Sequence, residues 1–293
     1  MVTVLGNTGK GRQASPLYTE HLLLGAIFGK NGAVRRYESE DMSLEEMPEG
    51  ETFLSDVSQV FTMLMANDPS QSFAEAAFAG KCLGVGSCAF EAVLTGVGSV
   101  VSIPLLARTG SREYVAFDLS ERSEALEAWL SFLKGAEQDG YAPYASLELD
   151  NVTGTHVVLA LWGLGAQAVL EDYVSREPLP KPGHVASCHL DKIPCVILAP
   201  DLGGVPCYLI LVPPQASVAL WRSFLSFTEV SVHGLDQFTR MLCKDLPLLE
   251  CLRSDDAIQL LPEQLVEQGV IRKEPSFVGS GRIYGNKRGD AHS

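Results

Sequence analysis

The order of apolar and polar positions along the chain predicts strands separated by single helices. Continuous apolar runs at 53–66, 113–117 and 155–163 are typical of buried strands. The stretches 88–108 and 193–212 are also apolar, but glycines interrupt each of them near the middle, so each predicts a hairpin. This alternation favours an α+β fold with mixed or antiparallel sheets over a doubly wound parallel sheet.

Between these runs, apolar residues recur with the period of an amphipathic helix in the segments 15–29, 67–80, 120–135, 166–174 and 214–227. At the start of the second segment, Asp68 is placed to cap the helix and Pro69 fits its first position. The third segment has one apolar face, formed by Leu126, Trp129, Leu130 and Leu133. Residues 38–51 are rich in acidic side chains and predict a surface loop.

The two halves of the chain share a pattern of strand, polar turn and helix. "EYVAFDLSERSEALEAWLSFL" and "CYLILVPPQASVALWRSFLSF" each carry a tyrosine near the start of the strand and W-x-S-F-L on the helix. This pattern predicts an internal structural repeat. We therefore expect Trp129 and Trp221 to occupy equivalent, buried places on two helices that each pack on a sheet.

Composition and charge narrow the class of protein. The chain has 293 residues, of which 46% are hydrophobic and 20% charged, so it is long enough for a large core. Its net charge of −14 argues against nucleic-acid and anionic-membrane partners, which bind clustered Lys and Arg. The opening residues lack an apolar signal segment, and the longest apolar stretch is too short to span a bilayer. The seven cysteines follow no regular framework, so we expect reduced thiols in a cytoplasmic protein.

Several of these segments match a known family in order. "SPLYTEHLLLGA", "FLSDVSQV", the hairpin at 88–108, "ALWGLGAQAVL", "PCYLILVPPQASVALWRSFL" and "PSFVG" together resemble the glycine-cleavage T-protein (aminomethyltransferase) family, which includes folate-dependent demethylases and other folate-binding relatives. The resemblance covers roughly residues 15–280. It implies two interleaved α+β subdomains at 16–279, followed in the family by a β-barrel around a central folate channel. Little sequence follows Gly279, so we expect no C-terminal barrel, with flexible tails at 1–15 and 280–293.

The resemblance also carries a set of cofactor-binding positions, which fall on Phe90, Ser102, Leu202, Leu209 and Phe238. The family has an aspartate beside the folate nitrogen at the position of Ser102, and a serine hydroxyl cannot act as a carboxylate base near neutral pH. Tyrosine, glutamate and arginine contacts of the family fall on Leu202, Val205, Leu209 and Phe238. Phe90 keeps the ring of a family tyrosine and loses its hydroxyl. The side chains that cannot hydrogen-bond the polar edge of a pterin are Leu202, Val205, Leu209 and Phe238. Tetrahydrofolate therefore follows from the resemblance and not from the residues.

Three functions remain open at this point. The chain is a tetrahydrofolate-dependent methyl or aminomethyl transferase, an accessory or ligand-binding subunit that has lost folate chemistry, or a transferase with a less polar donor or acceptor. In the second case the chain works as the partner of another protein, and in the third a protein partner supplies the missing barrel. We favour the accessory or ligand-binding subunit, assign no catalytic residue, and expect tetrahydrofolate to bind weakly or not at all.

Other groups of reactive side chains have simpler interpretations. His184, Cys188, His189 and Cys195 lie close in sequence, but their spacing fits no familiar zinc motif, and strand alternation puts Cys188 and His189 on opposite faces. We therefore expect buried or edge residues and no metal. Asp56 is expected to cap a turn. Trp162 is either a core side chain or the aromatic wall of a remodelled pocket.

Overall fold

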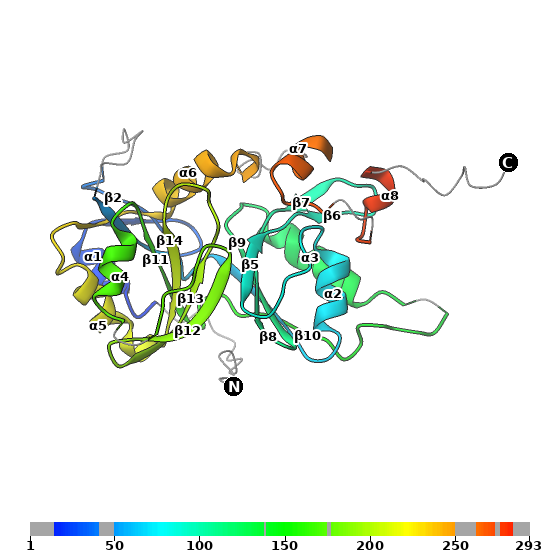
Figure 1. Ribbon diagram of the computed structural model, residues 1–293, viewed down its shortest axis with the longest axis horizontal. Coiled ribbons are helices and arrows are strands. Elements are labelled where there is room, and N and C mark those ends of the chain that lie inside the picture. The colour runs from blue at the N-terminus through cyan, green and yellow to red at the C-terminus, as the bar shows by residue number, and fades with distance from the viewer. Residues whose placement is uncertain are drawn as a thin grey trace. The chain divides into compact units, whose positions relative to one another are not determined.

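The structure is a computed structural model that describes residues 15–40, 50–137, 139–174, 177–249, 262–272 and 276–283 (Figure 1). Two compact units divide the chain, and each is built from two separate stretches. Unit 1 consists of Met1–Val60 and Val152–Asp245, and unit 2 consists of Phe61–Asn151 and Leu246–Ser293. The two interleaved α+β subdomains expected from the sequence are therefore confirmed.

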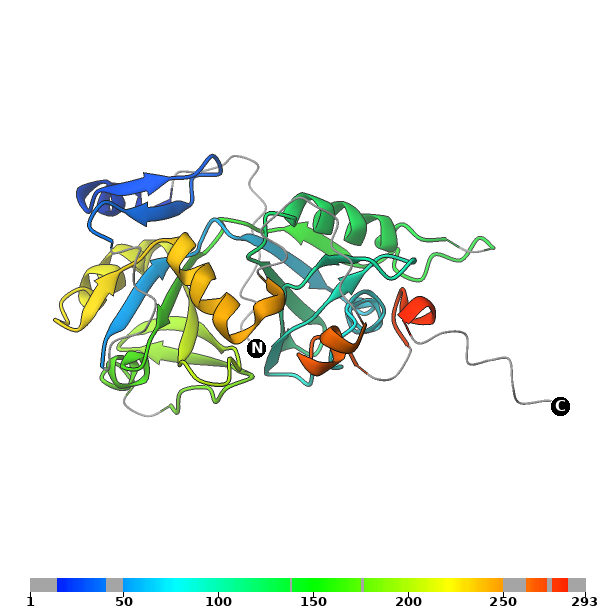
Figure 2. The same ribbon diagram turned by 90° about the horizontal axis from the view of Figure 1, so that it is seen from above.

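Unit 1 is organised by a mixed sheet in the strand order β12-β13-β14-β11-β3-β15. All neighbours in this sheet are antiparallel except β15, which runs parallel to β3. A separate hairpin of β1 and β2 lies outside this sheet, and Figure 2 draws it in dark blue. The elements are α1 (Tyr18–Leu23), β1 (Ala26–Phe28), β2 (Val34–Tyr37), β3 (Thr52–Asp56), β11 (Val157–Trp162), α4 (Ala166–Glu171), β12 (His184–Leu190), β13 (Ile193–Ala199), β14 (Cys207–Val212), α5 (Pro214–Phe224), β15 (Val230–Val232) and α6 (Leu235–Asp245).

Unit 2 contains an antiparallel sheet in the strand order β10-β4-β9-β8-β5 and a separate pair, β6 and β7. Helix α2 packs on β9, and α3 packs on β7 and β10. The elements are β4 (Phe61–Ala66), α2 (Ser70–Ala77), β5 (Ser87–Phe90), β6 (Val93–Leu94), β7 (Val100–Ser102), β8 (Leu105–Gly110), β9 (Glu113–Asp118), α3 (Ser123–Lys134), β10 (Glu148–Asn151), α7 (Pro262–Glu267) and α8 (Ser280–Ile283). Among the residues described after Val232, the structure has helices and no strand.

Some local expectations are wrong in instructive ways. The apolar run 53–66 is two strands, β3 and β4, because the chain turns at Val57–Val60 and passes from one unit to the other. The hairpin at 88–108 is confirmed by the pairing of Phe90 with Leu105, but its tip forms a second pair of strands, β6 and β7. Helix α2 begins after Pro69 without a side-chain cap, since Asp68 instead forms an exposed ion pair with Arg112.

Some expected segments lie outside the described residues. These are residues 1–14 of the N-terminal tail, residues 284–293 of the C-terminal tail, residues 41–49 of the acidic loop, and Cys251. Residues 280–283 of the expected tail form α8. Gly279, just before α8, lies so close to the β6–β7 hairpin that a Cβ there would come within 2.5 Å of the Thr95 carbonyl oxygen.

The repeated W-x-S-F-L motif occupies corresponding helices but not corresponding environments. In unit 1, Trp221 and Phe224 on α5 are both 0% exposed and belong to the core beneath that helix. In unit 2, Trp129 on α3 is only partly buried, and Phe132 is 65% exposed. The expected helix positions are correct, whereas the expected burial of Trp129 is wrong because α3 packs on unit 2 mainly through Leu126 and Leu130.

A buried chain of hydrogen bonds joins the N-terminal segments of unit 1. His21 on α1 is 1% exposed, and its Nε2 lies 2.8 Å from Asp56 Oδ2. The Tyr37 hydroxyl lies 2.9 Å from His21 Nδ1. Burial, more than any neighbouring charge, raises the pKa of Tyr37. The hydroxyl therefore keeps its proton and can donate a hydrogen bond to the ring. Asp56 Oδ1 also accepts from the backbone and the hydroxyl of Ser58. Asp56 therefore caps the turn after β3, as expected, and in addition anchors His21.

Truncation should separate the two tryptophans of the repeat. Trp221→Ala should lower the free energy of unfolding by about 3–5 kcal/mol, because it empties a closed core site. Trp129→Ala should lower it by only about 1–2 kcal/mol, since this side chain is only partly buried and its removal empties no closed site. Urea unfolding measures both. Equal losses would contradict the different packing of α3 and α5.

The His21 network should be sensitive to loss of its central ring. His21→Leu leaves Asp56 Oδ2 and the Tyr37 hydroxyl buried without partners, which costs about 1–3 kcal/mol for each group. Unfolding in urea should therefore show a loss of about 2–5 kcal/mol. His184→Leu is the control, because His184 is exposed and its replacement should change stability by less than about 0.5 kcal/mol. A loss as small for His21→Leu as for the control would show that the network does not hold the fold.

Candidate functional site

Two of the sequence-predicted site residues, Phe90 and Ser102, lie in unit 2. Phe90 ends β5 and is 8% exposed, while Ser102 ends β7 and is 0% exposed. The Ser102 hydroxyl donates a hydrogen bond of 2.8 Å to Asp118 Oδ1 and lies 3.1 Å from the Ser120 hydroxyl oxygen. The Ser102 hydroxyl is therefore hydrogen-bonded to a carboxyl group at the end of β9.

Asp118 was not identified from the sequence, although it is the carboxyl group next to Ser102. Its Oδ1 also accepts a hydrogen bond of 3.0 Å from the Ser120 backbone N–H. Its Oδ2 is buried and has no hydrogen-bond partner among the described residues. Burial raises the pKa of Asp118, and the hydrogen bonds from Ser120 and Ser102 oppose this only in part. Asp118 is therefore a buried acid whose Oδ2 could form a further hydrogen bond. The only signal in the sequence is the Asp-x-Ser turn after the strand, which does not point to Ser102.

The other predicted site residues, Leu202, Leu209 and Phe238, lie in unit 1. Leu202 follows β13 and is 8% exposed, while Leu209 is 2% exposed on β14, opposite Leu198 on β13 and Ala160 on β11. Val205, in the same loop as Leu202, is half-buried. No polar side-chain atoms are present on Leu202, Val205 and Leu209. These side chains therefore cannot form hydrogen bonds with a ligand.

Phe238 on α6 belongs to a buried aromatic cluster in unit 1. Its ring centroid lies 6.0 Å from that of Trp162, which in turn lies 4.5 Å from that of Phe53 and 5.9 Å from that of His233. Trp162 is 1% exposed, and its Nε1 donates a hydrogen bond of 3.1 Å to the Ser55 hydroxyl. Of the two interpretations left open for Trp162, the core side chain is the one that the packing supports.

These positions do not fit the polar edge of tetrahydrofolate. Among the five predicted residues only Ser102 has a polar side chain, and its hydroxyl is already hydrogen-bonded to Asp118. All five are less than a tenth exposed. A pterin placed against the predicted residues of either unit would bury its amide and amine groups without partners, at a cost of a few kcal/mol for each. No reaction step through folate can therefore be derived from these residues.

A second buried acid, Glu91, directly follows Phe90 and was also missed. It is 1% exposed, and its Oε1 has no hydrogen-bond partner among the described residues. Burial raises the pKa of Glu91 to about 8, and the charges of Arg272 and Lys81 lower it only in part. The Arg272 guanidinium donates hydrogen bonds to the carbonyl oxygens of Glu75, Phe78 and Gly80.

The cysteine and histidine cluster has no arrangement for a metal. Cys188 on β12 lies opposite Cys195 on β13, and both are buried, whereas His184 and His189 are exposed. Burial raises the pKa of the Cys188 thiol to about 11 and that of the Cys195 thiol to about 12, so both remain protonated near neutral pH. In the part of the chain that the structure describes, no group of three or more His, Cys, Asp or Glu side chains could hold a metal ion.

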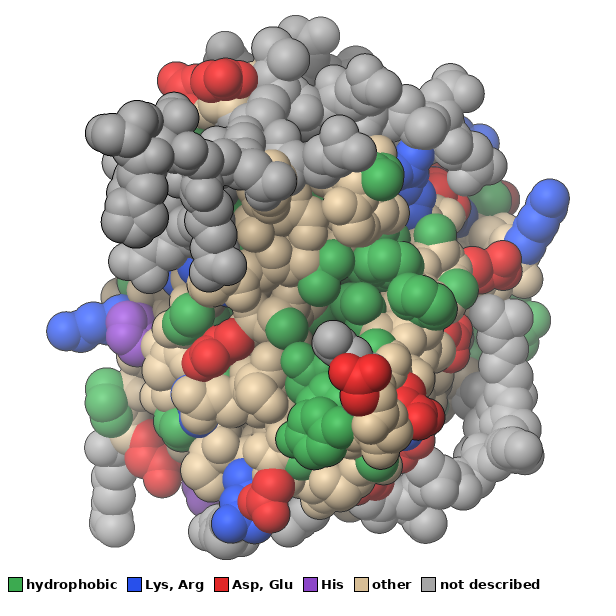
Figure 3. Space-filling model, turned by 90° about the vertical axis from the view of Figure 1, so that its right-hand side faces the viewer, with side chains coloured by type: hydrophobic (Ala, Val, Ile, Leu, Met, Phe, Trp, Pro, Cys, Tyr) green, Lys and Arg blue, Asp and Glu red, His purple; other side chains and the backbone are tan. Residues whose placement is uncertain are grey.

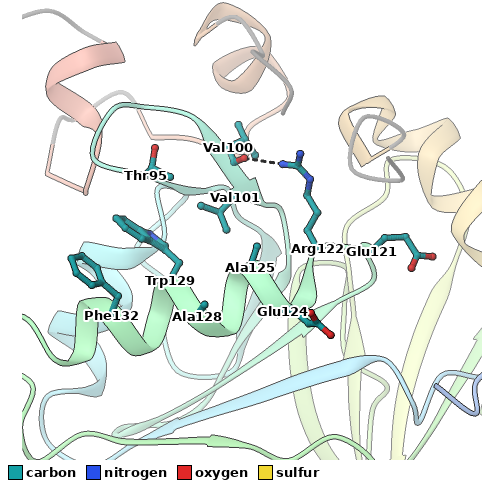
Figure 4. Close-up of a pocket in the computed structure, with 10 residues that line it drawn as sticks. All are labelled: Thr95, Val100, Val101, Glu121, Arg122, Glu124, Ala125, Ala128, Trp129 and Phe132. Carbon is teal, nitrogen blue, oxygen red and sulfur yellow. Dashed lines mark hydrogen bonds between the residues drawn. The ribbon is translucent and has the colours of Figure 1, made fainter. Parts of the chain in front are cut away.

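A groove of about 710 Å³ lies on unit 2, between α3 and the β6–β7 hairpin (Figure 4). Trp129 and Phe132 lie side by side at one end of α3, and Ala125 and Ala128 form its floor. Charged side chains lie at the other end, where the Arg122 guanidinium donates to the Val100 carbonyl oxygen at 3.1 Å. The full lining is Thr95, Val100, Val101, Glu121, Arg122, Glu124, Ala125, Ala128, Trp129 and Phe132. No pattern in the sequence had singled out this surface.

Comparison with known proteins identifies the fold. The glycine cleavage system aminomethyltransferase T from Bartonella henselae superposes with a TM-score of 0.68 at 17% sequence identity, over 94% of this chain and 74% of that one. A heterotetrameric sarcosine oxidase from Corynebacterium sp. U-96 matches with a TM-score of 0.40 at 16% identity, over 70% of this chain and 89% of that one. No protein-family model and no curated protein matches the sequence. The chain therefore has a T-protein-like fold.

No helix among the described residues is both long and apolar enough to cross a membrane.

Ionisation of Glu91 should make stability depend on pH. The folded pKa of about 8 lies above the usual value of 4.5, so between these values the folded chain holds a proton that the unfolded chain has released. The contribution of Glu91 to stability should therefore be complete below about pH 4.5, fall as pH rises, and level off above about 8, with a total change of at most about 5 kcal/mol. Glu91→Gln should remove this slope in urea unfolding from pH 5 to 8 (about the window of the shift). Glu148→Gln is the control, because Glu148 is exposed. Parallel pH profiles for Glu91→Gln and the unmodified chain would contradict the buried proton.

Proposed function

We propose that this chain is an accessory or ligand-binding subunit with a T-protein-like fold and without the tetrahydrofolate-dependent aminomethyl transfer of the glycine cleavage system. The fold supports a common architecture with aminomethyltransferase T. One observation carries the rest of the proposal. The only polar side chain among the predicted folate positions, Ser102, donates its hydroxyl to Asp118 and is 0% exposed. A carboxylate base at that place, which the family's chemistry requires, is absent.

The apolar positions in unit 1 support the same proposal. A site built to hydrogen-bond a ligand loses orders of magnitude in affinity when its polar groups are replaced, because the ligand's own polar atoms are then buried unpaired. Leu209 is held between neighbouring strands, and Phe238 lies against Trp162. Neither can turn a polar group toward a ligand. Stacking on Phe90 would contribute only about 0.5–1.5 kcal/mol beyond the area buried.

A second candidate is a tetrahydrofolate-dependent methyl or aminomethyl transferase with a remodelled site. The specific observation in its favour is Asp118, whose Oδ2 has no hydrogen-bond partner among the described residues. In this alternative the acid has moved from the end of β7 to the end of β9, and Ser102 holds it in place. The two candidates then differ in a single measurable property, which is whether Asp118 supports folate binding.

Calorimetric titration with tetrahydrofolate separates these candidates. We expect the unmodified chain to show no binding at micromolar concentrations, and Asp118→Asn to behave identically, because Asn keeps the acceptor for Ser102 and Ser120. Micromolar binding that Asp118→Asn abolishes would favour the remodelled transferase. Micromolar binding that Asp118→Asn leaves unchanged would place folate elsewhere on the chain and would also overturn the proposal.

A variant that introduces an acid at position 102 must also take the neighbouring Asp118 into account. Ser102→Asp alone would bring a second carboxyl against Asp118, and two such groups in a buried place cannot both ionise. The informative variant is therefore Ser102→Asp with Asp118→Asn, which returns the acid to the hairpin and leaves a neutral amide beside it. Circular dichroism and urea unfolding establish that this variant folds before it is titrated. Because Leu202 and Leu209 remain apolar, we expect it to bind tetrahydrofolate no better than the unmodified chain.

A further inference from the structure

The groove on α3 is the place where the internal repeat of the chain is incomplete. In unit 1, the aromatic residues of the W-x-S-F-L motif are covered by the chain itself. The His21 ring packs edge-on against Trp221 at 5.0 Å, and the Tyr173 ring packs against Phe224 at 5.1 Å. In unit 2, Trp129 stacks on Phe132 at 5.3 Å and 20°, and one side of Trp129 packs on the core while Phe132 is 65% exposed. The same motif therefore has a cover in one unit and an open apolar surface in the other.

The shape of the open surface suits a helix. Ala125 and Ala128 are small and lie between the aromatic end and the charged end of α3, so the backbone of a partner helix can approach closely there. Phe132 and Glu124 are eight residues apart on α3, which is about 12 Å along its axis. Two side chains separated by two turns on one face of another helix span a similar length. An apolar anchor and a charged group at that spacing can therefore meet both ends of the groove.

The charged side chains that line the groove indicate whether the charged group on the partner helix is acidic or basic. Glu121 and Glu124 are exposed at its polar end. Arg122, the cation beside them, donates to the Val100 carbonyl oxygen and is turned toward the hairpin. Two exposed carboxyl groups therefore line this end of the groove, on a chain whose net charge is −14. Figure 3 shows one face of the molecule, on which hydrophobic side chains gather and both acidic and basic side chains lie around them. A basic side chain complements this end.

We propose that this groove is the docking surface for an amphipathic helix of another protein, which places an apolar side chain on Trp129 and Phe132 and a Lys or Arg near Glu121 and Glu124. The helix takes the role in unit 2 that the chain's own α1 takes beside α5 in unit 1. The inference rests on the proposed accessory role, and it names the surface and the chemistry of the partner that this role requires. It does not depend on the residues tested by the folate titration. Failure of the peptide test can therefore be distinguished from failure of the folate test.

A designed peptide tests the proposal directly. The probe is an alanine-based helical peptide with two leucines one turn apart and two arginines two turns farther along the same face. A second peptide has the same composition, with its arginines on the opposite face, and a third carries glutamates in place of the arginines. Trp129 reports binding through its emission, because Trp162 and Trp221 are 1% and 0% exposed. Calorimetry gives the affinity at fixed ionic strength, since surface charges are screened by salt.

We expect the first peptide to bind and each of the other two to bind about tenfold more weakly. Phe132→Ser and Glu124→Lys should each weaken the first peptide by about tenfold, and Glu124→Lys should strengthen the third peptide. Leu23→Ser is the matched control, because Leu23 is an exposed apolar residue (76%) on α1 of unit 1, and it should change nothing. Phe132 is 65% exposed, so its replacement should leave the unfolding curve unchanged.

Several results would overturn the proposal. Equal affinity for the first two peptides, or an equal effect of Leu23→Ser and Phe132→Ser, would show unspecific attraction to an acidic chain. No binding of the first peptide at about 1 mM would show that the groove does not accept a helix. Light scattering that detects a dimer lost in Phe132→Ser would identify a second copy as the occupant. Stronger peptide binding after removal of residues 284–293 would identify the chain's own end as the occupant.

Discussion

The carboxylate of Asp56 is the point on which unit 1 depends. It lies at the end of β3, shortly before the chain leaves unit 1 at Val60. One oxygen meets His21 of α1, and the other accepts two hydrogen bonds from Ser58. The Ser58 hydroxyl in turn accepts from the backbone N–H of Val158 on β11 at 2.9 Å. A single buried carboxyl group therefore joins one helix, one turn and two neighbouring strands, and because both of its oxygens have hydrogen-bond partners, its burial is compatible with a stable fold.

Asp118 and Glu91 in unit 2 are buried to the same degree but are only partly satisfied. Asp56 has hydrogen-bond donors on both oxygens, whereas Asp118 and Glu91 each have one oxygen without a partner among the described residues. Desolvation raises the pKa of both acids in unit 2. A fold tolerates such a cost where something else requires the group, which is why incompletely paired acids are better functional candidates than complete networks. In unit 2 they lie at the ends of β5 and β9, next to the two positions that the family resemblance selected.

The sequence predicted the helices and strands better than the contacts between them. The apolar periods in 120–135 and 214–227 predicted the helices α3 and α5, because hydrophobic spacing is a local property. The interleaved fold was implied by the family resemblance and did not follow from spacing. The division of 53–66 between two units was not predictable, since two consecutive buried strands and one long strand have the same apolar composition. The pairing of Ser102 with Asp118 joins residues sixteen positions apart on different strands, and no local pattern encodes it. The exposed side of α3 was not predictable either, because the same motif is covered by distant segments in unit 1 and left exposed in unit 2.

The buried proton of Glu91 changes how the charge of this chain should be counted. The formal value of −14 treats every carboxyl as ionised. With a pKa of about 8, Glu91 is mostly neutral near pH 7 in the folded chain, so folding takes up most of one proton from the solvent. The heat of unfolding then includes the ionisation heat of whichever buffer accepts that proton. Calorimetric enthalpies measured in phosphate and in Tris would therefore differ for a chain whose structure is the same in both.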